Sequence, residues 1–250
     1  MTNPDQRPFI SAIEVRSLDF GMYDFLHPNY AFLATWKNYG KNSTQLLRYP
    51  EDPYDRYWEA EVGTNLMPIS VGSDTQILAA DLPDKPPQSV LQTALTILNS
   101  SGNGISLLNY TSTELYINLY FAELLQLNSS QKRSFNVYTN NVPLSQQPII
   151  PPYLSALQVF VNINVSSATV LSLSRTRDST LPPLINAMEL FEKNVELTDG
   201  TFDTDVKALA LLQSAFSKLQ EWRGDPCLPE SFTWDWVECS NDKMPRISKL

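Results

Sequence analysis

The sequence predicts a mainly β protein, a β-sandwich followed by a single α-helix. Three observations predict it. Apolar residues recur at every second position in several short segments, most clearly in Glu114–Tyr138. Pro, Gly, Asn or Ser residues bound these segments, as is usual for strands joined by turns. A helical period is clear only after Thr198, so the helix is expected at the carboxyl end.

The segment Glu114–Tyr138 is expected to form the centre of the sheet. Leu115, Ile117, Leu119 and Phe121 alternate with more polar residues, and the pattern resumes at 135–137. The polar run 128–133 between them suits a connection between antiparallel strands. We therefore predict a β-hairpin with one buried face, which other strands must cover because an isolated hairpin is marginal in water.

The remaining elements follow from the same patterns. Residues 48–58 fit neither the helix nor the strand template and are expected to form an ordered loop. A helix is expected from about 204 to 224, with its apolar stripe at Val206, Leu209, Leu212, Phe216 and Leu219 and with Thr204 or Asp203 as N-cap. Further strands are predicted at 8–18, 30–36, 90–98, 157–165, 168–173 and 184–191, and a last one begins at 245–250.

Composition and charge exclude several classes of partner. The formal net charge is −9 and the isoelectric point is about 4.6. An acidic surface disfavours nucleic acid and anionic membranes, whereas basic peptides or neutral ligands remain compatible. The sequence contains no apolar run long enough to span a membrane, and residues 1–20 lack the features of a signal peptide.

Glycosylation sequons and cysteines point instead to an exported protein. Two cysteines, Cys227 and Cys239, are close enough in sequence to close a small loop, and in an oxidising compartment a bridge would add about 3 kcal/mol of stability. An exported protein without a signal peptide suggests a truncated chain. The Asn-X-Ser/Thr sequons, which favour a glycosylated surface over chance composition, are at Asn42, Asn99, Asn109, Asn128 and Asn164.

The residue types in the sequence give little support for a catalytic site. His27 is the only histidine and is expected to be structural or a surface residue, because neither a Ser-His-Asp triad nor a zinc site can be assembled around it. Arg223-Gly224-Asp225 spells an adhesion tripeptide, but turn chemistry explains it. We expect no metal, no cofactor and no enzymatic activity.

Acidic residues could form a sugar, calcium or glycosidase site. Glu51, Asp52 and Asp55 cluster in one loop, and two carboxylates suffice for glycoside hydrolysis. The favoured interpretation is that these acids pair with Arg48 and Arg56 and stabilise a turn. Glu123, in the predicted hairpin, is similarly expected to be an edge residue.

Aromatic residues in the same loop allow a second hypothesis. Sugar sites stack aromatic rings on a pyranose and use Asp or Asn to bind its hydroxyls, and this loop supplies both types of residue. Packing of the rings into the protein is the favoured alternative. The candidate ligand-binding residues are Tyr49, Asp52, Tyr54, Asp55 and Trp58.

The order of these segments resembles the ectodomains of plant leucine-rich-repeat receptor-like kinases with malectin-like domains, the senescence-induced and symbiosis receptor kinases among them. Arg48–Trp58, RYPEDPYDRYW, is similar to that family's Arg-x-Pro-Asp-Asp-x-x-Asp-Arg-x-Trp marker, with Glu51 in place of its first Asp. Trp222–Cys227, Trp234–Trp236 and Cys239 resemble the paired-cysteine cap that precedes leucine-rich repeats.

The resemblance implies a domain organisation and a function. It implies a jelly-roll-like antiparallel sandwich, with 1–22 ending a truncated first malectin-like module, 23–192 forming a second, 193–203 a linker, 204–240 the cap and 241–250 the start of the first repeat. The expected role is non-catalytic recognition of a peptide or co-receptor ectodomain at the extracellular face of the plasma membrane. The alternative is a lectin-like module for cell-wall or glucose-containing glycans. The kinase domain of the relatives is absent from this sequence, as are a signal peptide and a transmembrane helix.

Overall fold

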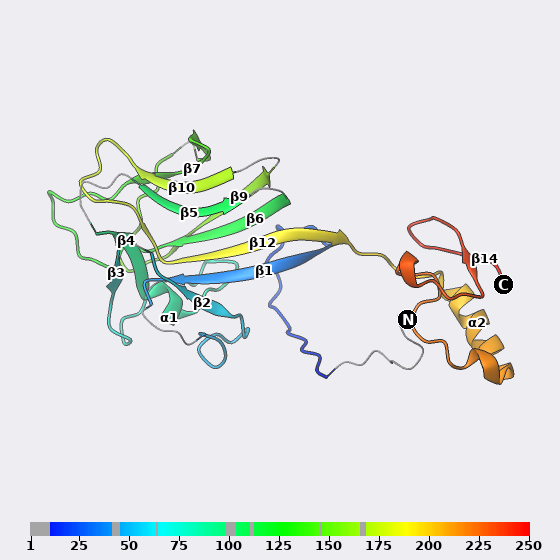
Figure 1. Cartoon of the computed structure of the whole chain (residues 1–250). Helices are drawn as coiled ribbons and strands as arrows, with labels where there is room; N and C mark the ends of the chain where they lie inside the picture. The colour runs from blue at the N-terminus through cyan, green and yellow to red at the C-terminus, as the bar shows by residue number, and fades with distance from the viewer. Residues whose placement is uncertain are drawn as a thin grey trace. The chain divides into compact units, whose positions relative to one another are not determined.

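The computed structural model describes residues 11–41, 46–63, 65–98, 104–110, 113–145, 147–165 and 169–250. The chain divides into two units, one formed by Val15–Val195 and one that contains Glu196–Leu250. The first unit is built mainly of strands, which confirms the predicted mainly β class (Figure 1). Its elements are β1 (Tyr30–Tyr39), β2 (Trp58–Glu61), β3 (Leu66–Ser70), α1 (Gln88–Leu91), β4 (Thr93–Ile97), β5 (Gly104–Tyr110), β6 (Thr113–Phe121), β7 (Phe135–Thr139), β8 (Val142–Pro143), β9 (Leu157–Val165), β10 (Thr169–Arg175), β11 (Leu184–Ile185) and β12 (Ala187–Glu196).

Two sheets of this unit face each other across an apolar core (Figure 1). One sheet has the strand order β2-β1-β12-β6-β9, and the other has the order β5-β10-β7-β8. The inward face of β6 is fully buried, as the alternation in the sequence predicts. The core includes Leu115, Ile117, Leu119 and Phe121 of β6, Phe135 and Val137 of β7, and Leu171 and Leu173 of β10.

The predicted hairpin of β6 and β7 is wrong. β6 pairs with β9 and β12, whereas β7 pairs with β10 and β8 in the opposite sheet. Phe121 and Phe135 therefore meet across the core, with ring centroids 5.2 Å apart and nearly edge to face. Residues 122–134 cross between the sheets, where the buried ion pair between Glu123 Oε2 and Arg133 Nε spans 2.6 Å. Glu123 is consequently a buried residue and not the edge residue that we expected.

Asn186 divides the single strand predicted at 184–191. β11 pairs with β4 in a three-stranded sheet, and β12 pairs with β6 in the five-stranded sheet. The buried Asn186 side chain joins the two sheets: Oδ1 accepts from Ala122 N at 2.7 Å, and Nδ2 donates to the carbonyls of Leu91 and Thr93. The predicted strand at 90–98 is likewise divided between α1 and β4.

The amino-terminal strand predicted at 8–18 is wrong for the residues that the structure describes. Residues 11–29 contain no strand, and Val15–Pro28 belongs to the first unit. Phe20 is fully exposed, whereas Met22, two residues later, is 7% exposed. Arg16 and Asp19 attach this segment to the loop 48–58, through Tyr57 and Tyr54 respectively.

The second unit contains the predicted helix and the disulfide. The helix is α2 (Asp203–Ala215), and a single turn of 3-10 helix (Ser217–Leu219) follows it, so the predicted extension to residue 224 is wrong. Of the predicted stripe only Leu209 is buried, and the N-cap is Phe202 rather than Thr204 or Asp203. A second 3-10 turn (Glu230–Phe232) precedes β13 (Glu238–Cys239), which pairs with β14 (Ile247–Lys249) where a strand was expected.

Candidate functional site

The loop 48–58 lies between β1 and β2, ends on the first residue of β2, and is closed at its base by backbone hydrogen bonds between Leu47 and Trp58. Asp52 lies at the centre of the loop and is completely buried. Its carboxylate accepts from Arg56 Nε at 2.6 Å, from Trp58 Nε1 at 2.7 Å and from Tyr54 N at 3.0 Å. Asp52 therefore organises the loop from within, because each of its oxygens already has a donor.

Arg56 connects this loop to three other segments. Its Nη1 donates to the hydroxyl of Tyr23 at 2.8 Å and to the carbonyl of Asp84 at 2.6 Å, and its Nη2 donates to the carbonyl of Lys85 at 2.7 Å. Its guanidinium is 3.2 Å from Glu189 Oε1 on β12. A planar guanidinium with five donors is suited to hold several segments at fixed angles.

Glu189, on β12, is fully buried in the site. Burial raises the pKa of its carboxyl, although Arg56 and hydrogen bonds from Tyr120 and Tyr23 act in the opposite direction. Asn118 Nδ2 donates to Glu189 at 3.0 Å, and it also donates to Asp84 at 2.7 Å. We call this set the buried polar cluster, and its members are Tyr23, Asp52, Arg56, Asp84, Asn118, Tyr120 and Glu189.

The outer side of the loop is a second, more exposed arrangement. The guanidinium carbons of Arg48 and Arg16 lie 4.4 and 4.9 Å from the centroid of the Tyr57 ring. Asp55 binds both arginines, with Arg48 Nε at 2.7 Å, and also accepts from the backbone N–H of Tyr49 at 3.0 Å. Arg48 in particular holds the pKa of Asp55 well below its usual range. The carboxylate is therefore ionised and already occupied.

The five candidate ligand-binding residues thus lie in different environments. Tyr49 is 68% exposed, and Tyr54 is partly exposed with its hydroxyl bonded to Asp19 at 2.7 Å. Asp52 and Trp58 are buried and cannot contact a ligand, whereas Asp55 is partly exposed. Ligand contact by these residues stays a prediction, and among the five candidates only Tyr49 is exposed rather than partly exposed or buried.

The sequence predicted that the loop acids pair with Arg48 and Arg56, and the structure pairs Asp52 with Arg56 and Asp55 with Arg48. It missed Asp84 and Glu189, which reach Arg56 from far along the chain. Glu189 stands on the strand predicted at 184–191, and a charged residue within an apolar strand was the available signal. Among the described residues, no group of three or more His, Cys, Asp or Glu side chains could hold a metal ion.

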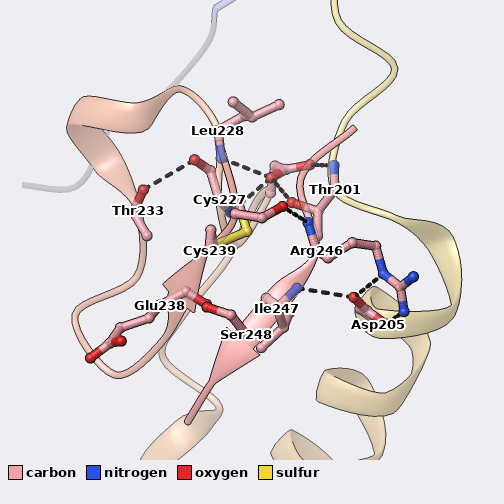
Figure 2. Close-up of a disulfide and its surroundings, with 12 residues drawn as sticks. Thr201, Asp205, Cys227, Leu228, Thr233, Glu238, Cys239, Arg246, Ile247 and Ser248 are labelled. Carbon is pink, nitrogen blue, oxygen red and sulfur yellow. Dashed lines mark hydrogen bonds and ion pairs between the residues drawn. A yellow bond between two sulfur atoms is a disulfide. The ribbon is translucent and has the colours of Figure 1, made fainter. Parts of the chain in front are cut away.

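The cysteine site of the second unit is shown in Figure 2. Cys227 and Cys239 form the expected disulfide, with their Cα atoms 5.9 Å apart. Asp225 accepts from Thr201 N at 2.7 Å and from the backbone N–H of Cys227 and Leu228 at 2.9 and 2.8 Å. Although partial burial opposes it, these hydrogen bonds lower the pKa of Asp225. The carboxylate of the Arg-Gly-Asp tripeptide therefore holds a turn, as expected.

A second contact in the same unit joins the helix to the last strand. Asp205 of α2 accepts from Arg246 Nε at 2.8 Å and from the backbone N–H of Ile247 at 3.0 Å (Figure 2). The Arg246 guanidinium also lies 4.1 Å from the centroid of the Phe202 ring. Residues 200–250 are thus held together by polar contacts around a small apolar cluster of Leu209, Trp234 and Val237.

Comparison with known proteins decides the family. The model of the malectin-like domain family matches residues 1–193. The chain belongs to the malectin-like domain family. A leucine-rich repeat receptor-like serine/threonine-protein kinase of Arabidopsis thaliana is 34% identical to this malectin-like protein over 260 residues, which cover 97% of the chain and 28% of the relative. The chain thus spans just over a quarter of the length of the curated relatives that it matches.

Solved structures show the same fold. The extracellular domain of ANXUR2 from Arabidopsis thaliana superposes with a TM-score of 0.55 at 14% identity, over 66% of this chain and 49% of that chain. The plant receptor-like kinase FER superposes with a TM-score of 0.51 at 17% identity, over 64% and 49% of the two chains. The malectin-like chain is a non-catalytic module, and the kinase domain belongs to the full-length relatives. Within the described residues, no helix is long and apolar enough to cross a membrane.

Proposed function

We propose that this chain is an extracellular recognition module of a plant malectin-like leucine-rich-repeat receptor-like kinase, and that it binds a peptide or the ectodomain of a co-receptor. Family membership and the alignment of a receptor-like kinase over 97% of the chain support this role. In the same proposal, 1–22 is the end of a truncated first malectin-like module, 23–192 forms a second, 193–203 is a linker, 204–240 forms the cap and 241–250 starts the first leucine-rich repeat.

The observation that carries the choice of a protein ligand is that two of the three loop carboxylates, those of Asp52 and Asp55, are already bound within the protein. A lectin site needs free Asp or Asn groups beside an exposed ring to bind sugar hydroxyls. Here Asp52 is buried against Arg56 and Trp58, and Asp55 is bound by Arg48. The exposed ring of Tyr49 remains, and such a ring is a typical anchor of protein interfaces.

Charge indicates the chemistry of the partner. With a net charge of −9, long-range attraction favours a basic peptide or a basic face of a co-receptor. Such long-range attraction raises the rate of association more than the affinity. We therefore expect the association rate constant to fall as the salt concentration rises.

Exposed sequons fit an extracellular location. The side chains of Asn128 and Asn164 are exposed, and we propose both as glycosylation sites. Asn42 and Asn99 lie outside the described residues, and so does the side chain of Asn109. Glycosylation at these three positions stays a prediction from the sequence.

A binding screen with the whole secreted chain tests the proposal. The immobilised chain is exposed to a library of basic peptides, to receptor ectodomains and to soluble cell-wall and glucose-containing glycans. We expect retention of a peptide or an ectodomain, and Tyr49→Ala should weaken it about tenfold, the effect of a loss of about 1.4 kcal/mol. Tyr153→Ala is the matched control, since Tyr153 is a comparably exposed tyrosine outside the loop.

The competing outcomes are distinct. Retention of glycans alone, lost in Tyr49→Ala, would establish the lectin alternative and overturn the proposed protein ligand. If Tyr49→Ala and Tyr153→Ala retained the ligand equally well, the loop 48–58 would not be part of the binding site. If the folded chain retained nothing from any of the three sets, recognition by this module would be refuted.

A further inference from the structure

The outer face of the five-stranded sheet, opposite the core, carries an ordered array of side chains. The register of β6 with β9 places Asn164 opposite Glu114, Asn162 opposite Tyr116, and Phe160 opposite Asn118. On the other side of β6, Phe191 of β12 is opposite Tyr116. Because residues two apart in a strand share a face, Phe160, Asn162 and Asn164 all point to this outer side.

Aromatic rings gather at the centre of this face. Phe25, from the segment before β1, lies 4.5 Å from Phe160, 5.9 Å from Phe191 and 6.5 Å from Tyr116, measured between ring centroids. Phe32 of β1 meets Tyr116 edge to face at 5.5 Å. We call these five residues the aromatic face. Phe160 is 44% exposed, and Phe25 and Phe32 are half-buried, so the aromatic face presents ring surface to solvent.

Polar groups border the aromatic face along one side. Lys193 Nζ binds Glu114 Oε2 at 2.8 Å, and Glu114 also accepts from the hydroxyl of Tyr116 at 2.9 Å. Next to them on β9 stands Asn164, which is exposed and begins the sequon Asn164-Val165-Ser166. Diagonal neighbours on antiparallel strands lie about 7–8 Å apart, so Tyr116 is next to Asn164 on this face.

We propose that Asn164 carries an N-linked glycan whose first sugars lie along β9 over the aromatic face and cover Phe160. The proposal rests on the extracellular location proposed above, because this modification is made during secretion. In the reaction, Nδ2 of Asn164 bonds to C1 of a lipid-diphosphate-linked oligosaccharide. The bond from C1 to the diphosphate oxygen breaks, the amide loses one proton, and the lipid diphosphate leaves.

The chemistry of the face matches a pyranose. The C–H face of a sugar ring packs on aromatic rings, and its hydroxyls bind amide groups such as that of the exposed Asn162. Phe160 lies four residues before Asn164, or about 13 Å along an extended strand. A glycan of more than one sugar spans that distance. Asn162 lies between Phe160 and Asn164 on the same face, and its polar side chain can contact the sugar that passes over it. The glycan attached to Asn164 would then cover the aromatic face.

The test compares two sequon knockouts in a secretory host. Ser166→Ala removes glycosylation at Asn164 without changing the asparagine, and Ser130→Ala does the same at Asn128, which lies in the loop between β6 and β7. Mass mapping should find Asn164 glycosylated. We expect Ser166→Ala to lower the melting temperature by about 2–4 °C, a measurable change for a unit of this size. Ser130→Ala should leave the melting temperature unchanged.

A double-mutant cycle separates stacking from other effects of the glycan. In a Phe160→Thr background, Ser166→Ala should no longer lower the melting temperature. The acetyl methyl protons of the first sugars should show an upfield ring-current shift in the wild type and lose it in Phe160→Thr. An unmodified Asn164 in the secreted protein, or the same temperature loss with and without Phe160, would overturn the proposal. No ligand is needed, so a chain that failed the binding screen could still pass this test.

Discussion

Arg56 and Asp52 form an ion pair of 2.6 Å in which the side chains are only 2% and 0% exposed. Asp52 binds groups of the loop itself, whereas Arg56 also binds partners from β12 and from residues 23 and 84–85. The marker sequence of the loop therefore serves first to hold the malectin-like module together.

Removing the arginine should destabilise the module strongly. Arg56→Met leaves Asp52 and Glu189 buried without their cation, and we expect a loss of about 3–5 kcal/mol in the free energy of unfolding. Urea unfolding followed by circular dichroism measures it. Arg48→Gln is the matched control, because Arg48 pairs with Asp55 on the exposed side and should cost about 1 kcal/mol or less. Equal losses for the two variants would contradict the structural role of the buried polar cluster.

Asn186 should be intolerant of truncation. Its amide makes three hydrogen bonds between two sheets, so Asn186→Ala leaves buried backbone groups without partners. We expect a loss of about 2–4 kcal/mol in the free energy of unfolding. The exposed Asn29→Ala should change it by about 0.5 kcal/mol or less. A near-neutral Asn186→Ala would show that water replaces the amide.

The ion pair between Lys132 and Asp178 should be visible in an acid titration. The hydrogen bond from Lys132 lowers the pKa of Asp178 to about 2 from the model-peptide value of 3.8. Since the folded pKa lies below the unfolded one, the stabilisation is present above about pH 4 and is lost as the pH falls through about 2. Carboxyl-carbon NMR should follow this titration, and Lys132→Gln should return the pKa toward 3.8. An unchanged pKa in that variant would refute the assignment.

The disulfide should stabilise its own unit. Breaking a bridge across a loop of this length costs about 3 kcal/mol. In the Cys227→Ser, Cys239→Ser variant we expect faster amide hydrogen exchange at Ile247–Lys249 and unchanged exchange in β6. The β6 amides thus act as an internal control. Loss of protection in both units would mean that the bridge supports the whole chain.

Local patterns in the sequence predicted many elements well. The alternation in β6 and β9 reports which face of each strand is apolar, because that depends only on the period of the backbone. It did not predict the partner of β6. β7 could pair with β6 in a hairpin or lie in the opposite sheet, and both arrangements bury the same side chains of β6 and β7. Which arrangement forms depends on how all the strands of the unit pair.

The sequence by itself determined the mainly β class, the cysteine pair and the pairing of loop acids with loop arginines, since each depends on residues that are near in sequence. The tertiary structure decided that Asp52 and Trp58 are buried, that Glu189 joins them, and that Phe25 packs against Phe160. Burial and electrostatic environment depend on segments brought together from distant parts of the chain. For that reason the sequence could name the residues of the candidate loop, whereas which of them are accessible could not be predicted from it.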